Sequence, residues 1–214
     1  MKSVRKGSLA LSPKDDNDQR RIHLERLADL AISMGASDAK IIASSDILVK
    51  DELAKRCSQP RCQNYGLAPS CPPHVSGPAG FRDLQRKLEQ ALVVRVVVPS
   101  AMLLSSVSTE LGRFVCELVA SIEKEAIRMG FTRSRAFAGG SCKELFCQDH
   151  SECPKLSGTG ECRYPKYARP SMSGYGIDVF ALMKTCGWST NPSKEEGVWK
   201  DESVAWVAGL VMIG

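Results

Sequence analysis

Residues 91–99 read Ala-Leu-Val-Val-Arg-Val-Val-Val-Pro, and this stretch decides the fold class. The run is shorter than the roughly 18 apolar residues that a membrane span requires, and Arg95 interrupts it, so it predicts a buried strand. Working outward, Phe81–Gln90 predicts a helix before the strand. Val107–Met129 predicts a long helix after it, because apolar side chains recur on one face. The centre of the chain therefore predicts helices that pack against a sheet.

Helices and strands also alternate on both sides of this centre. The expected elements are a helix that begins near Asp15 and ends at Gly35, a strand over Asp38–Ala43, a helix from Ser45 or Asp46 to Lys55, a strand over Arg133–Ala138, a helix over Tyr175–Cys186 and a strand over Ser203–Ile213. We expect an α/β or α+β fold, with a four- to five-stranded sheet flanked by helices and two cysteine-rich metal-binding loops. Residues 1–14 are expected to form a flexible tail and residues 15–214 a single domain.

The composition is that of an ordinary globular protein with one core. Hydrophobic residues make up 43% of the 214, and the net charge of +5 comes from 29 basic and 24 acidic residues spread along the chain. Nucleic acid is therefore not an expected partner. The apolar patch within Met1–Lys14 is too short for a secretory signal, so we expect a cytoplasmic protein that is not bound to a membrane. In a reducing compartment, closely spaced cysteines indicate metal binding before disulfides.

Seven of the nine cysteines lie in two segments of the sequence, each of which opens with the same Cys-x4-Cys spacing. We call Cys57, Cys62 and Cys71 the first cysteine group, and Cys142, Cys147, Cys153 and Cys162 the second cysteine group. Thiolate is a ligand for both iron–sulfur clusters and zinc. These seven residues are therefore the expected metal and cofactor ligands.

The spacing favours iron–sulfur clusters over zinc. Structural zinc usually takes cysteines two to four residues apart, whereas each group contains a gap of eight residues. A proline directly follows Cys71 and Cys153, as in ferredoxin binding runs. We expect one or two 4Fe–4S clusters, with zinc as the alternative.

The first cysteine group has only three thiols, which leaves its fourth ligand open. The position could stay free for a small molecule, or His74, Cys116 or Cys186 could complete it. Cys116 and Cys186 are also typical of small buried side chains in predicted helices. The sequence alone does not decide among these alternatives.

Several motifs near the cysteines resemble one protein family. They are Cys62-Gln-Asn-Tyr65-Gly66, Ser70-Cys71-Pro72-Pro73, Gly139-Gly-Ser-Cys142, Cys162-Arg-Tyr-Pro165-Lys-Tyr-Ala-Arg169-Pro170-Ser171-Met172 and Gly176-Ile-Asp178-Val179. From about Cys57 to Trp188 the chain resembles the predicted metal-binding proteins grouped as domain of unknown function 2284. The resemblance implies that the seven cysteines of both groups are metal positions, and it implies no reaction. The sequence departs from the family at Ser173, where many members carry an acidic residue.

Three functions follow from the cysteine pattern. The first is an iron–sulfur protein that acts in electron transfer, or as a redox accessory whose partner is a redox protein or a larger enzyme. The second is an enzyme in which a cluster at the three-cysteine site binds a small molecule for substrate or sulfur chemistry. The third is an interaction module stapled by zinc. No catalytic serine triad, phosphate-binding loop or dinucleotide fingerprint is present in the sequence.

Overall fold

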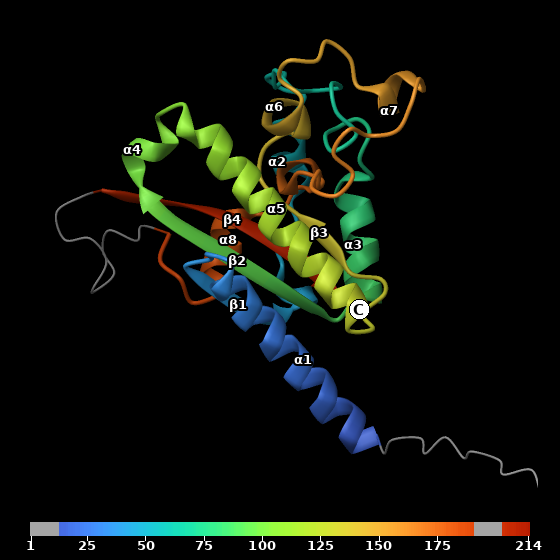
Figure 1. Cartoon of the computed structure of the whole chain (residues 1–214), viewed down its shortest axis with the longest axis vertical. Coiled ribbons are helices and arrows are strands. Elements are labelled where there is room, and N and C mark those ends of the chain that lie inside the picture. Colours follow the sequence, from blue (N-terminus) through green and yellow to red (C-terminus); the bar gives the residue numbers. More distant parts are fainter. Residues whose placement is uncertain (1–12, 191–202) are drawn as a thin grey trace, which may run out of the picture.

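The computed structural model describes residues 13–190 and 203–214, which build one α+β domain (Figure 1). Its sheet has the order β1-β2-β4-β3, and every neighbouring pair is antiparallel. The strands are β1 (Asp38–Ala43), β2 (Gln90–Pro99), β3 (Arg135–Phe137) and β4 (Val204–Ile213). Of the two expected fold classes, the antiparallel pairing selects α+β, and the sheet has the lower of the two expected strand numbers.

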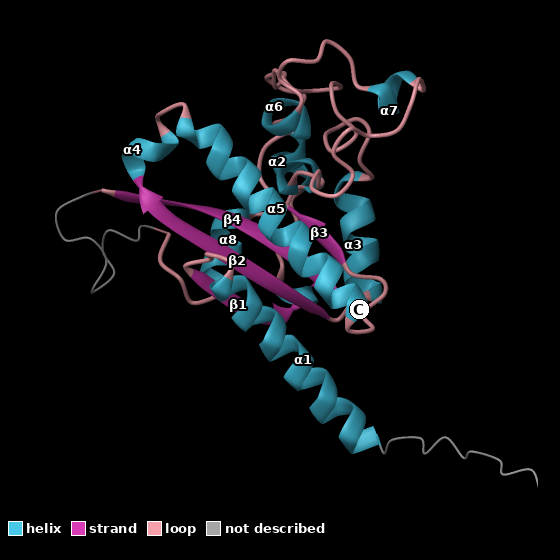
Figure 2. Ribbon diagram, viewed as in Figure 1, coloured by secondary structure: helices cyan, strands magenta, loops and turns pink. Residues whose placement is uncertain are grey.

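Helices cover both faces of the sheet. The helices are α1 (Pro13–Ser33), α2 (Asp51–Lys55), α3 (Gly77–Lys87), α4 (Ser100–Leu103), α5 (Val107–Arg128), α6 (Cys142–Phe146), α7 (Pro154–Ser157) and α8 (Val179–Thr185), with short 3-10 helices η1 (Ser44–Asp46) and η2 (Met172–Tyr175). α1 and α5 pack on one face, and α3, η2 and α8 contribute the core of the other (Figure 2). The tail expected over residues 1–14 lies outside the described residues up to residue 12.

The stretch at residues 91–99 forms most of the central strand β2, as the sequence predicts. Leu92, Val94, Val96 and Val98 face the α1–α5 side, whereas Ala91 and Val93 belong to the core on the α8 side. Arg95 is buried on that second side, where its Nε donates to Asp38 Oδ2 at 2.8 Å and its guanidinium lies over the Trp188 ring. The charge inside the apolar run is therefore paired, and the strand is not interrupted.

The long helix α5 packs closely on β4 because a glycine faces it. A Cβ at Gly209 would lie 2.4 Å from a methyl carbon of Val119 and 3.2 Å from one of Val115. A larger residue there would push the helix away from the sheet. The apolar face predicted for this helix is confirmed, since Leu111, Leu118 and Ile122 are buried.

Two predicted helices are shorter than expected. The helix predicted from Ser45 or Asp46 to Lys55 is divided into η1 and α2, because the residues between them pair with another segment: Val49 bridges Ile177, and Lys50 N–H donates to Gly176 O at 2.8 Å. The helix predicted to begin at Tyr175 begins at Val179, where Asp178 caps it by accepting from Ala181 N–H. The extended pairing thus replaces helix in both segments.

Both cysteine-rich segments gather at one end of the molecule, where the second of them includes α6 and α7 (Figure 1). The segment around Gly176 packs against the chain just before α2, which leads into the first of them. A Cβ at Gly176 would lie 2.3 Å from Lys50 O, and the φ of Gly176, +71°, is one that glycine adopts readily.

Among the described residues, no helix has the length and apolar character needed to cross a membrane.

Candidate metal centre

The first cysteine group surrounds one cavity. Cys57 follows α2, and tight turns then carry the chain back, since Cys62 N–H donates to Cys57 O and Cys71 N–H donates to Ala68 O. All three thiols line a cavity of about 220 Å³. Burial raises the pKa of the Cys57 thiol, and the neighbouring Cys62 and Cys71 raise it further. Three thiols that repel each other when ionised form a site that a bound cation would stabilise.

The lining of this cavity also includes polar residues. Asn64 and Glu144 line it, and Asn64 Nδ2 donates to Glu144 Oε2 at 2.7 Å. The hydroxyl-bearing residues Ser141, Ser171 and Ser173 line it too. Sequence reasoning missed Glu144 as a site residue, although its position two residues after Cys142 could have indicated it.

The three residues considered as a fourth ligand lie elsewhere. His74 Nε2 forms a hydrogen bond with Gly66 O at 3.2 Å, and His74 does not line the cavity. Cys116 is buried in α5 near the second cysteine group. Burial is the main cause that raises its pKa to about 12; the nearby Cys142 also raises the pKa, whereas a hydrogen bond with the Arg169 backbone lowers it. Cys186 follows α8 and is buried with the core on the α8 side of the sheet.

The second cysteine group is also brought together. Cys142 begins α6, Cys147 follows it, and Cys153 precedes α7. The four thiols line one narrow cavity of about 20 Å³, and Cys142 and Cys162 also line a neighbouring cavity of about 250 Å³. Tyr164 N–H donates to Cys162 Sγ at 3.4 Å, the kind of bond that stabilises a thiolate.

Aromatic and basic side chains enclose the second cysteine group. The Phe146 ring stacks on the Tyr164 ring with centroids 5.4 Å apart, and both line the narrow cavity. Burial raises the pKa of the Cys147 thiol, while the positive charges of Arg163 and Lys143 lower it. These two cations would offset the negative charge of a thiolate-bound metal centre.

Ser70 connects the two cysteine groups. Its Oγ lies 3.8 Å from Cys71 Sγ and accepts a hydrogen bond of 3.2 Å from Cys142 N–H. Burial is the main cause that raises the pKa of Cys142, and the nearby Cys71 raises it further. The two groups are therefore neighbours, although about 70 residues separate them in the sequence.

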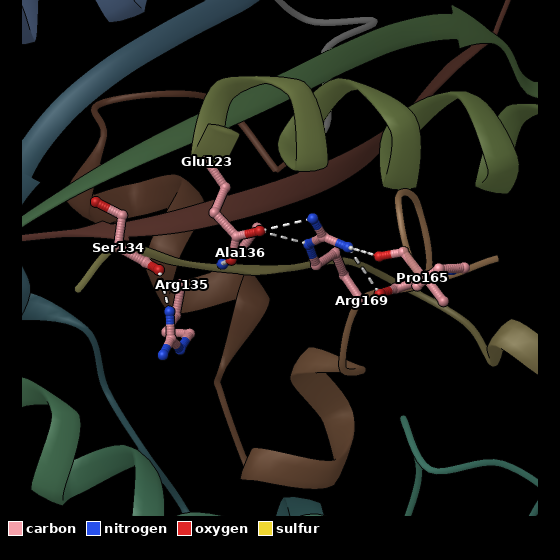
Figure 3. Close-up of polar contacts among 7 residues, drawn as sticks. Glu123, Ser134, Arg135, Ala136, Pro165 and Arg169 are labelled. Atoms are coloured by element: carbon pink, nitrogen blue, oxygen red, sulfur yellow. Dashed lines mark hydrogen bonds and ion pairs between the residues drawn. The ribbon is translucent and has the colours of Figure 1, made fainter. Parts of the chain in front are cut away.

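A buried ion pair fastens the second cysteine segment to α5 and β3 (Figure 3). Glu123 Oε2 accepts from Arg169 Nε at 2.7 Å, and Glu123 Oε1 accepts from Ala136 N–H at 2.8 Å. Arg169 also donates to the carbonyl oxygens of Pro165 and Ala168. Sequence reasoning quoted Arg169 in a motif without assigning this role, and it did not identify Glu123.

The possible metal ligands that line these cavities are mainly cysteine thiols. Within residues 13–190 and 203–214, no three Cys, His, Asp or Glu side chains converge closely enough to hold a single metal ion as they stand. Soft thiolate ligands suit zinc and iron–sulfur clusters and are a poor match for magnesium or calcium. In donor chemistry, the thiols therefore suit either of the two metal centres expected from the sequence.

Comparison with known proteins identifies the family. The model of the family described as "Predicted metal-binding protein (DUF2284)" matches residues 40–213. The chain belongs to this family. No curated protein and no solved structure matches the chain.

The match to DUF2284 covers both parts of the candidate centre. In this DUF2284 protein, the seven cysteines of the two groups lie inside residues 40–213, as do Glu123, Glu144 and Arg169. The family description supports metal binding by a cysteine-rich protein and does not identify the metal.

Proposed function

We propose that the chain is an iron–sulfur protein that holds two 4Fe–4S clusters and acts in electron transfer, by itself or as a redox accessory to a larger enzyme. The observation that carries the proposal is the gathering of seven thiols into two neighbouring groups bridged by Ser70. Closely spaced redox centres are what a protein needs to pass electrons inward from its surface.

The space beside the first cysteine group supports a cluster over zinc at that group. A tetrahedral zinc ion lies about 2.3 Å from each thiolate sulfur and needs four ligands in one tight shell. The first cysteine group instead supplies three thiols around a cavity of about 220 Å³. The four thiols of the second group line a cavity of about 20 Å³, and two of them, Cys142 and Cys162, also line a neighbouring cavity of about 250 Å³. A zinc-stapled interaction module is the alternative that metal analysis separates.

The two groups suit different parts of an electron route. Cys62 is exposed, so a redox partner could approach the first group directly. The second group lies beside the Phe146–Tyr164 stack and near the positive charges of Lys143 and Arg163. When bound, a cluster supplies reversible one-electron transfer, and its potential depends on such burial and nearby charge.

A second candidate function is enzymatic. The polar wall formed by Asn64 and Glu144 gives the three-cysteine cavity groups that could position a small molecule. Under this function the first group is a reaction site, and the second supplies electrons to it.

Electron paramagnetic resonance of the reduced protein tests the proposal. We expect dithionite to produce signals from two clusters that interact magnetically, because their ligands Cys71 and Cys142 are neighbours. Cys147→Ala should lower the iron content by about half and leave the signal of one isolated cluster. Cys186→Ala, which lies outside both groups, is the matched control and should match the wild type. A reduced protein without cluster signals, or a signal unchanged in Cys147→Ala, would contradict the proposal.

A further inference from the structure

A second cavity, of about 320 Å³, opens beside the first cysteine group. It lies between α5, β4, α6 and η2, and we call it the apolar pocket. It shares three lining residues with the three-cysteine cavity: Gly140, Glu144 and Ser173. The two cavities are therefore adjacent across these residues.

The lining of the apolar pocket has two chemically different ends. Val115, Leu145, Met172 and Ala208 are buried and form apolar walls. At the end shared with the three-cysteine cavity lies the carboxylate of Glu144, the only charged group among the lining residues, all of which the structure describes. Pockets of about 300 Å³ or more with apolar walls and a few polar groups are typical of small-molecule sites.

The carboxylate of Glu144 has capacity for a further hydrogen bond. Asn64 donates to Oε2, and in the described part of the chain no other group donates to this carboxylate. A carboxylate can accept several hydrogen bonds, so Oε1 can accept one from a ligand. An anionic ligand would meet the negative charge of Glu144 with no basic residue in the lining to offset it.

We propose that the apolar pocket binds a small uncharged molecule with an apolar body and one hydrogen-bond-donating end group, such as a hydroxyl or a thiol, which donates to Glu144 beside the three-cysteine cavity. The adjacency of the two cavities across Gly140, Glu144 and Ser173 carries this inference. The role of the pocket as a substrate site for the metal centre rests on the proposed function, whereas binding itself does not.

Methionine-methyl NMR with a pair of isomeric probes tests the binding. Pentan-1-ol can donate a hydrogen bond, and its isomer butyl methyl ether cannot. In air-free protein labelled at methionine methyl groups, pentan-1-ol should shift the Met172 signal saturably, and the ether should bind about tenfold more weakly. Met183, buried in the core on the α8 side, is the internal control. A Met172 signal that does not move, or a Met183 signal that moves equally, overturns the proposal.

Two variants and one control variant locate the ligand. Ser108→Leu places a larger side chain in the pocket and should weaken pentan-1-ol binding at least tenfold, whereas Ser121→Leu, on the same helix but outside the pocket, should change it less than twofold. Glu144→Met removes the acceptor at similar length and should weaken the alcohol about tenfold while leaving the ether unchanged. Equal weakening of both probes would overturn the role of Glu144.

Iron and sulfide measured on the same sample separate this inference from the proposed function. Probe binding with the expected variant pattern in a protein that lacks iron and sulfide would support the pocket and contradict the proposed function. A cluster-loaded protein in which Met172 does not respond would instead support the proposed function and overturn the pocket.

Discussion

Cys186 differs from the seven cysteines of the two groups because the fold buries it in the core on the α8 side of the sheet. Burial raises its pKa from 9.0 to about 11, although the positive charges of Lys40 and Arg95 lower it in part. At neutral pH its thiol is therefore protonated and unreactive, since the thiolate is the nucleophile.

Alkylation of the metal-free protein tests this difference. At pH 8 the raised pKa alone should slow iodoacetamide labelling of Cys186 roughly 100-fold relative to the unfolded chain, and the rate should increase about tenfold per pH unit toward pH 11. Cys62, which is exposed, should react quickly. Mass spectrometry of tryptic peptides measures both rates. Equal labelling of Cys186 and Cys62 at pH 8 would be inconsistent with a buried Cys186.

At the residue scale, the sequence predicts candidate ligands better than it predicts their surroundings. Repeated Cys-x4-Cys spacing is a local signal, so both cysteine groups can be named from the sequence alone. Glu144 and Asn64 belong to the same cavity, yet 80 residues separate them, and no local pattern links them. Such a pair becomes visible only when the two loops are brought together.

At the scale of elements, the Glu123–Arg169 ion pair explains how a long irregular segment is held on a regular scaffold. Glu123 belongs to the buried face of α5, and its carboxylate also accepts a hydrogen bond from the edge strand β3. Arg169 ends the second cysteine segment, seven residues after Cys162. The pair thus connects helix, strand and loop at one point.

Removal of one partner of this pair should be costly. Glu123→Ala leaves the Arg169 guanidinium buried without its carboxylate, and we expect it to lower the free energy of unfolding by about 3–5 kcal/mol. Glu125→Ala, two residues further on, removes a surface ion pair with Arg128 and should have little effect. Urea denaturation followed by circular dichroism measures both. Similar stabilities of the two variants would show that the buried pair does not anchor the segment.

Elements set by local sequence signals are predicted well, whereas segments that pair with distant parts of the chain are not. β1 and the long helix α5 match their predicted bounds within a residue. The helix carries its own apolar periodicity and is followed by Gly130, which ends it. The sequence predicts helix at residues 47–50 and at Tyr175–Asp178, yet Val49 and Lys50 pair with Ile177 and Gly176. Pairing between segments more than 120 residues apart overrides local helix propensity.

At the scale of the whole molecule, a sheet covered by helices on both faces supports the cysteine-rich end. The strand β2 is buried on both faces, under a core supplied by α1 and α5 on one side and by α3 and α8 on the other. Neither core contains a cysteine of the first cysteine group. The antiparallel strand order could not be predicted from the sequence, because the partner of β2 is β4, more than 100 residues away. Leu145 and Phe146 of α6 extend the α1–α5 core into the second cysteine segment, so this core and the Glu123–Arg169 pair order that segment. A bound metal would contribute most to the order of the first cysteine group.

The most direct test of this account is the amount of iron, acid-labile sulfide and zinc per chain in protein purified without air. Two 4Fe–4S clusters predict about eight irons and about eight sulfides per chain, with visible absorption that dithionite bleaches. Zinc without sulfide would contradict the iron–sulfur account and leave the two cysteine groups as structural metal sites.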